Sequence, residues 1–159
     1  MKQMTKETLK NKKKVFKDPY LKPVIFGGLT TTLLSIIFAP GIFLWSIIGG
    51  YVAVRLTNKL TKEIVSTVDS LLLGLFSGII GASCLNLVTV ISFNNADNQR
   101  ILIRTLEKNW PKDIPIPEIS NLLPKILLIT SILIVIVAVL FSIIGSYIGL
   151  FLTKNKKKT

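Results

Sequence analysis

The chain has 159 residues, half of them apolar, with a net charge of +12, a single cysteine and no histidine. It is too short for two ordinary globular domains. One cysteine excludes an internal disulfide framework, and the lack of histidine removes the commonest metal ligand. Three stretches, Val24–Val54, Ser70–Ala96 and Ile126–Thr153, contain no Asp, Glu, Lys or Arg. Each exceeds the roughly 18 residues that a membrane-spanning helix needs. The composition therefore predicts an all-α fold, a polytopic membrane helical bundle.

The positive charge is concentrated in two tails. Residues 1–22 contain eight lysines and two acidic residues, and residues 153–159 contain four lysines. Lysine clusters beside apolar spans are typical of cytoplasmic segments that attract anionic lipid. Nucleic-acid-binding surfaces usually combine arginine with aromatic residues, whereas the basic residues of these tails are all lysine, so we expect the lipid bilayer and no nucleic acid as partner.

The first apolar stretch predicts a helical hairpin. It is interrupted at Pro40-Gly41, a pair that strongly favours a turn, so we expect spans over 24–39 and 42–56. Each arm would be about 23 Å long, which is short against a hydrocarbon core of about 30 Å. The arms could cross a thinned bilayer, or they could form a re-entrant hairpin that stops partway.

The remaining apolar stretches predict two further spans, over 70–93 and 126–152. Asp69 and Ser70 occupy the positions of helix-capping residues at the start of the first of these spans. We place the start of the last span after Pro124-Lys125, because the residue before a proline tends to leave the helical region.

The connection between these two spans, residues 94–125, also contains a helical pattern. Within residues 95–109 and the following tryptophan, positions 99, 103, 106 and 110 share one helical face, and Ile103, Leu106 and Trp110 occupy three of them. This pattern favours a short helix on the membrane surface, with Trp110 at the headgroups. A loosely structured loop is the alternative.

The distribution of charge predicts the topology of the membrane domain, residues 23–152. Four crossings place both tails on the cytoplasmic side of a prokaryotic inner membrane, together with Arg55, Lys59 and Lys62, and export the nearly neutral loop 94–125. Three crossings would export the C-terminal lysines, which the positive-inside rule disfavours. A re-entrant hairpin predicts the same sidedness as four crossings.

Small residues recur four apart on the predicted helices. Close packing drives helix association in lipid, and it needs small residues at the contact. The candidate packing residues are Gly49, Gly50, Gly74, Gly78, Gly81, Gly145 and Gly149. They predict either an interface with a second copy or another membrane protein, or packing among the chain's own helices.

Polar residues at span depth define a second candidate site. Thr30, Thr31, Thr32, Ser35 and Asn86 could line a path for a polar solute. Alternatively, the threonines bond their own backbone and Asn86 links two helices. No Asp, Glu, Lys or Arg lies in the interior of a span, and Arg55 sits at the very end of the second. Without histidine the serines and the cysteine lack a usual activating base. We expect no catalytic residues, no metal and no cofactor.

Three glycine-containing motifs run through residues 23–93. They are Pro23-xxx-Gly27-Gly28, Trp45-xxx-Gly49-Gly50-xx-Ala53 and Asp69-xxxx-Gly74-xxx-Gly78-xx-Gly81. This region resembles uncharacterised prokaryotic glycine-rich small multi-pass membrane proteins, and the resemblance implies no activity and no site residues. The sequence predicts a non-enzymatic scaffold, accessory subunit or self-assembling bundle, with a small transporter or channel subunit as the alternative.

Overall fold

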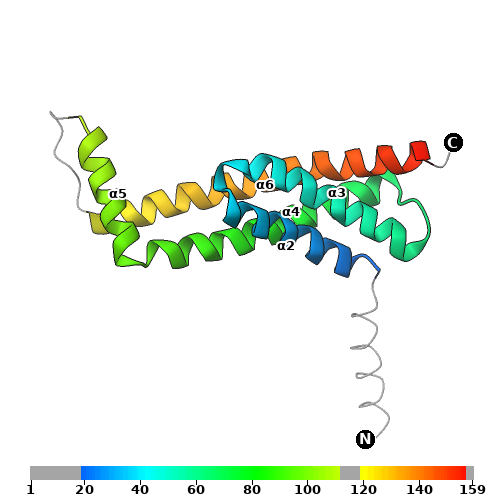
Figure 1. The fold of residues 1–159 in the computed structure, drawn as a ribbon, viewed down its shortest axis with the longest axis horizontal. Helices are drawn as coiled ribbons and strands as arrows, with labels where there is room; N and C mark the ends of the chain where they lie inside the picture. Colours follow the sequence, from blue (N-terminus) through cyan, green and yellow to red (C-terminus); the bar gives the residue numbers. More distant parts are fainter. Residues whose placement is uncertain (1–18, 112–118, 157–159) are drawn as a thin grey trace, which may run out of the picture.

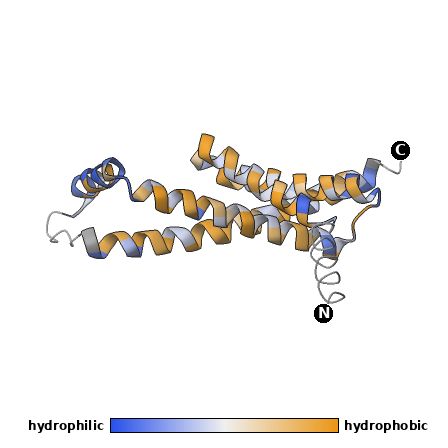
Figure 2. Cartoon of the chain, turned by 90° about the horizontal axis from the view of Figure 1, so that it is seen from below, coloured by the Kyte–Doolittle hydropathy of each residue, from blue (hydrophilic) through white to orange (hydrophobic). Residues whose placement is uncertain are grey.

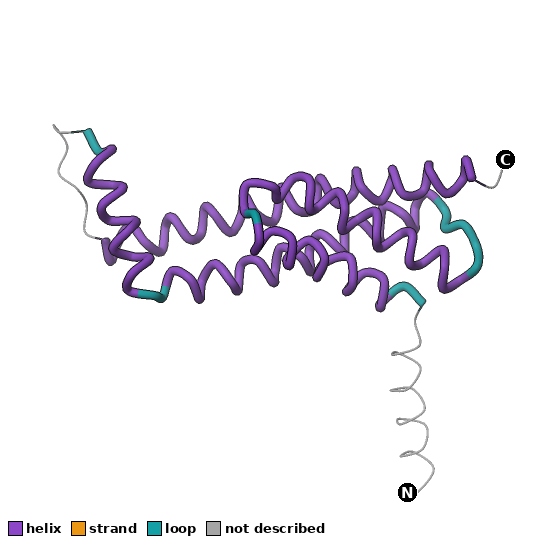
Figure 3. The backbone as a smooth tube through the Cα atoms, viewed as in Figure 1, coloured by secondary structure: helices purple, strands orange, loops and turns teal. Residues whose placement is uncertain are grey.

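The computed structural model describes residues 19–111 and 119–156, and these are helical over almost their whole length (Figures 1 and 3). The elements are α2 (Leu21–Ile37), the 3₁₀ turn η1 (Ala39–Gly41), α3 (Ile42–Thr61), α4 (Thr67–Phe93), α5 (Ala96–Asn109) and α6 (Ile119–Lys156). No strand occurs among the described residues, so the predicted all-α class is confirmed. Most of the predicted tail 1–22, residues 112–118 of the loop and residues 157–159 lie outside the described residues.

Three helical segments are long and apolar enough to cross a membrane: Ala39–Thr61, Thr67–Phe93 and Asn121–Asn155. The other apolar helix of the hairpin, α2, has 17 residues, or about 25 Å of helix. The structure therefore supports a membrane-spanning helical bundle, whereas four complete crossings remain a prediction.

The bundle is arranged around α3 and α4. These two helices pack against each other, α2 packs against both of them, and α6 packs against both of them as well. In Figure 1, α4 and α6 run along the long axis in opposite directions. The α2–α3 hairpin lies beside the half in which α4 begins and α6 ends.

Small residues fill the interior of this bundle, and large apolar residues cover its outside. The largest fully buried side chains among the described residues are Val54 and Pro23, together with threonines and serines, whereas Phe26 and Leu33 are 57% and 62% exposed. Figure 2 shows hydrophobic residues along the long helices and hydrophilic ones gathered on α5 and at the opposite end of the bundle. A water-soluble protein rarely exposes so much contiguous apolar surface, so this arrangement fits lipid as the surroundings.

The predicted turn at Pro40-Gly41 is confirmed. Pro40 is the middle residue of η1, and the carbonyl oxygen of Phe38 accepts hydrogen bonds from the Gly41 amide (3.1 Å) and the Trp45 indole (2.9 Å). A β-carbon on Gly41 would collide with that indole. The turn therefore depends on glycine for space as well as on proline for its backbone angle.

The link between α3 and α4 corrects one prediction, because α4 begins at Thr67 rather than at residue 70. Its cap is Ser66, whose hydroxyl accepts a hydrogen bond from the Asp69 amide and donates one to the Asp69 carboxylate. Ser66 and Asp69 thus resemble a capping box, a pattern whose first member lies in the polar connection before the apolar run. Ser70, also predicted as a cap, is buried inside the helix.

The start of α6 corrects a second prediction. The helix begins at Ile119 and runs through Pro124, which lies in its second turn. A proline removes one backbone hydrogen-bond donor, but the helix continues through it over 38 residues. The tendency of the residue before a proline to leave the helical region is overridden here by the long apolar helix that follows.

The helix predicted after the third span is confirmed as α5. Gln99, Ile103, Leu106 and Trp110 are all partly buried, and Ile101, which falls off that face, is 61% exposed. Asn95 caps the helix by accepting a hydrogen bond from the Asp97 amide at 3.0 Å.

Candidate functional site

The candidate packing glycines of α3 and α6 lie where these two helices touch. A β-carbon on Gly50 would overlap the carbonyl oxygen of Ser142, and one on Gly145 would overlap the carbonyl oxygen of Ile47. Gly149 has more room, with Tyr51 atoms at 3.3 Å from such a β-carbon. The helix backbones thus approach most closely at Gly50 and Gly145, where a methyl group cannot fit.

The candidate glycines of α4 serve two neighbours. Gly74 and Gly78 face α6, where a β-carbon would come within 2.8 Å and 2.7 Å of the Cα atoms of Ile143 and Val139. Gly81 lies on the same side of α4 but contacts α2, where a β-carbon would lie 3.2 Å from the Gly28 carbonyl oxygen and from the Thr31 β-carbon.

The remaining candidate glycine, Gly49, lies where the two helices of the hairpin, α2 and α3, touch. A β-carbon on Gly49 would lie 2.6 Å from the carbonyl oxygen of Gly27 and would collide with the Thr31 hydroxyl. All seven candidate glycines therefore lie at contacts between helices of the chain itself, which is the internal-packing alternative.

The residues of the candidate polar path are divided between two places. Thr30 donates to the Phe26 carbonyl (2.7 Å). Thr31 and Thr32 donate to the carbonyls of Gly27 (3.3 Å) and Gly28 (3.0 Å). Each threonine hydroxyl thus bonds the backbone of its own helix one turn earlier, which is the alternative to binding a solute.

Two of the threonine hydroxyls also reach a neighbouring helix. That of Thr31 lies 3.3 Å from the Trp45 carbonyl oxygen of α3, and that of Thr32 lies 3.3 Å from the Gly81 carbonyl oxygen of α4. Asn86 lies apart from them and donates to the Ser131 carbonyl of α6 at 3.5 Å. Ser35 is buried and its hydroxyl has no hydrogen-bond partner among the described residues. This bonding gives the transporter or channel alternative no support.

Serine hydroxyls in the interior fall into two classes that make a testable pair. Ser70 donates to the Ser146 carbonyl at 2.9 Å and so links α4 to α6, whereas the buried Ser46 hydroxyl has no partner among the described residues. We expect Ser70→Ala to lower the free energy of unfolding by about 0.6–1 kcal/mol. Ser46→Ala should leave it unchanged or raise it, because no bond is lost. Unfolding of both variants in a denaturing detergent series measures this, and a larger loss for Ser46→Ala would contradict it.

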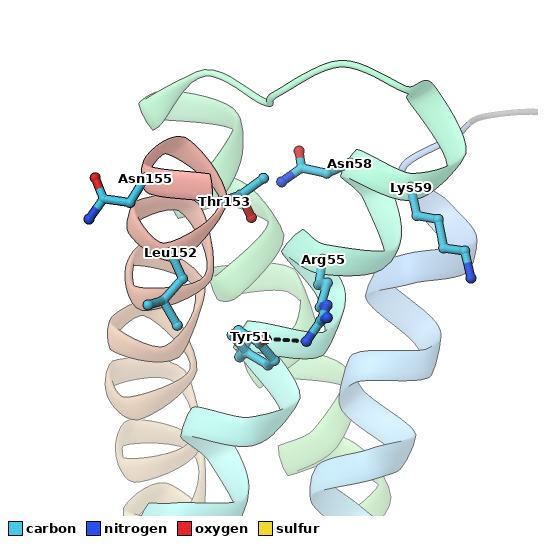
Figure 4. Close-up of a pocket in the computed structure, with 7 residues that line it drawn as sticks. All are labelled: Tyr51, Arg55, Asn58, Lys59, Leu152, Thr153 and Asn155. Atoms are coloured by element: carbon cyan, nitrogen blue, oxygen red, sulfur yellow. Dashed lines mark hydrogen bonds between the residues drawn. The ribbon is translucent and has the colours of Figure 1, made fainter. Parts of the chain in front are cut away.

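A pocket of about 660 Å³ lies between the C-terminal parts of α3 and α6 (Figure 4). It is lined by Tyr51, Arg55, Asn58, Lys59, Leu152, Thr153 and Asn155. One guanidinium nitrogen of Arg55 donates to the Tyr51 hydroxyl, and the guanidinium carbon lies 5.7 Å from the centre of the Tyr51 ring. In Figure 4 the Lys59 amino group points away from α6.

The sequence indicated only part of this pocket. Arg55 and Lys59 stood out as charges at the end of a predicted span, and Tyr51, Arg55 and Lys59 are four residues apart, which places them on one helical face. Asn58 and Thr153 were missed, because the two come from helices almost a hundred residues apart.

Reactive groups do not gather elsewhere in the described part of the chain. Within residues 19–111 and 119–156 no three His, Cys, Asp or Glu side chains lie close enough to hold a metal ion. The one ion pair recorded there joins Arg100 to Asp97 on the surface of α5 at 3.8 Å.

Comparison of the chain with protein-family models, characterised proteins and solved structures finds no match. The resemblance to glycine-rich prokaryotic membrane proteins therefore stays a prediction.

Proposed function

We propose that the protein is a non-enzymatic, four-crossing protein of a prokaryotic cytoplasmic membrane, with both termini on the cytoplasmic side. It acts as a scaffold or accessory subunit by associating with a second copy of itself. The positive-inside rule supports this orientation, because Arg55, Lys59 and Lys62 lie at the end of the bundle that also carries Lys154.

One observation carries the proposal: α4 and α6 continue beyond the tip of the α2–α3 hairpin (Figure 1). The buried residues of α4 lie between Ser70 and Leu85. Those of α6, among its described side chains, lie between Ala138 and Leu150. Residues 86–93 of α4 and 121–137 of α6, which we call the association segment, are therefore a pair of apolar helices that extends beyond the hairpin, with α5 in contact at the end of α4.

A second copy is the partner that this geometry favours. Every copy inserts with the same topology, so the association segments of two molecules lie at the same depth in the bilayer. A two-fold axis along the membrane normal can then bring identical surfaces together, which is the commonest symmetry of protein assemblies. The glycines that could have served a different interface are already used inside the bundle.

Cysteine crosslinking in native membranes tests the proposal. Cys84 is first replaced by serine, and single cysteines are then placed at Ile91 and Leu133 of the association segment and at Leu33 of α2, all of which are more than half exposed. We expect a covalent dimer from Ile91→Cys or Leu133→Cys and none from Leu33→Cys.

Two results would reject self-association. One is a product of heterogeneous mass, which would identify another membrane protein as the partner. The other is equal crosslinking at Leu33, which would indicate random collision.

A further inference from the structure

The pocket between α3 and α6 offers several hydrogen-bond donors and no acid. None of the residues that line it is acidic, and Arg55 and Lys59 form no ion pair with a carboxylate in the described part of the chain. A pocket with uncompensated positive charge favours an anion. We propose that it binds the phosphate group of an anionic lipid headgroup.

Arg55 is oriented for this role. Its guanidinium is held against Tyr51 by a hydrogen bond and by the face of the ring. A guanidinium has five N–H donors, and the bond to Tyr51 uses one of them. The others remain for two oxygens of one phosphate, a geometry that arginine recognises in bidentate fashion.

Asn58 supplies a second donor without a partner. Its amide oxygen accepts a hydrogen bond from the Val65 amide at 2.9 Å, which fixes the orientation of the group. Its amide nitrogen is buried and has no partner among the described residues. Figure 4 shows this nitrogen directed toward Thr153 on the opposite wall. A buried donor without an acceptor is unfavourable, and a phosphate oxygen in the pocket would satisfy it.

The depth of the pocket favours a lipid over a soluble phosphate. Arg55 directly follows the charge-free stretch that ends at Val54, and Lys154 directly follows the one that ends at Thr153. Both helices therefore pass from apolar to charged residues at the level where lipid phosphates lie. Leu152, half exposed on the wall of the pocket, continues into the apolar outer surface of α6 and offers a contact for the glycerol and upper acyl chain.

Native mass spectrometry of the full chain, purified in mild detergent and titrated with phosphatidylglycerol or phosphatidylcholine, tests the assignment. We expect one saturable phosphatidylglycerol site and weaker binding of phosphatidylcholine. Arg55→Gln should lower the affinity for phosphatidylglycerol roughly tenfold or more. Asn58→Asp should do the same, because it keeps the acceptor for the Val65 amide but replaces the free donor with a negative charge.

The matched control is Lys62→Gln, which removes one positive charge from the same end of the bundle, outside the pocket. It should change the affinity by less than about twofold, and circular dichroism should show unchanged helix content in all three variants. Equal losses for Lys62→Gln and Arg55→Gln would show diffuse attraction and overturn the proposal. So would equal binding of phosphatidylcholine, or inorganic phosphate binding as tightly as the lipid.

This inference rests on the proposed placement of the pocket at the headgroup layer. The mass measurement nevertheless reports lipid binding whether or not the chain self-associates, so each proposal can fail without the other.

Discussion

Gly145→Ala is expected to separate α6 from α3 and to lower the free energy of unfolding by about 2 kcal/mol. The added methyl group would overlap the carbonyl oxygen of Ile47 and would also crowd that residue's Cα atom, at 2.7 Å. These are backbone atoms of a helix, so they cannot rotate away as a side chain could. The helices must move apart, and the dispersion contacts that hold them together in lipid weaken over the whole interface.

Gly149→Ala is the matched control for this variant. It lies one helical turn further along the same face, and its β-carbon would meet Tyr51 at 3.3–3.4 Å, a tight contact that a shift of a few tenths of an ångström relieves. Both variants gain the same helix propensity, about 1 kcal/mol for alanine over glycine, so the difference between them isolates the clash. Reversible unfolding in mixed micelles measures both. Equal stabilities would show that α3 and α6 do not approach at Gly145 as closely as the structure places them.

The parts of the fold that depend on neighbouring residues could be predicted from the sequence. Pro40-Gly41 specifies a turn by its own backbone chemistry, and the face of α5 follows from the spacing of Ile103, Leu106 and Trp110. The helix ends were predicted less well. Ser66 caps α4 from within a polar connection, and α6 passes through Pro124, so in both places the helix extends beyond the apolar run used to define it.

The partners of each small residue could not be predicted, because a spacing of four fixes a face of a helix but not the neighbour that it meets. Gly78 and Gly81 are three residues apart, yet Gly78 contacts α6 and Gly81 contacts α2. The same limit applies to the pocket. Tyr51 and Asn58 are on α3, Thr153 is on α6, and the packing of these two helices, closest at Gly50 and Gly145, brings them together.

The tip of the α2–α3 hairpin is expected to be accessible from the exported side of the membrane. In a Cys84→Ser background, Ala39→Cys should react with a small membrane-impermeant maleimide added to intact cells. The structure makes this a demanding test, because the tip does not reach the end of α4. Thr32 bonds the Gly81 carbonyl, six residues separate Thr32 from Phe38, and twelve separate Gly81 from Phe93. At 1.5 Å per residue the tip therefore falls about 9 Å short.

The balance of energies nevertheless favours a hydrated tip. Two helix ends meet there, and Gly41, which precedes α3, has no side chain to cap its first turn. Among the described residues only Trp45 supplies a side-chain hydrogen bond to the turn. Each backbone group left unsatisfied in hydrocarbon costs several kcal/mol, whereas thinning the bilayer costs fractions of a kcal/mol per Å. A local thinning of about 9 Å is therefore the smaller penalty.

Two controls define the outcome of the labelling. Asn95→Cys, at the exposed start of α5, should react faster than Ala39→Cys from the same side, and Lys62→Cys should react only after the cells are opened. Labelling of Ala39→Cys from outside would establish two crossings by the hairpin. Failure of Ala39→Cys to react from outside, while Asn95→Cys reacts, would show a re-entrant hairpin whose turn stays within the bilayer. Among the described residues, the exported side would then carry only the ends of α4 and α6, with α5 between them, and the four-crossing topology would be wrong.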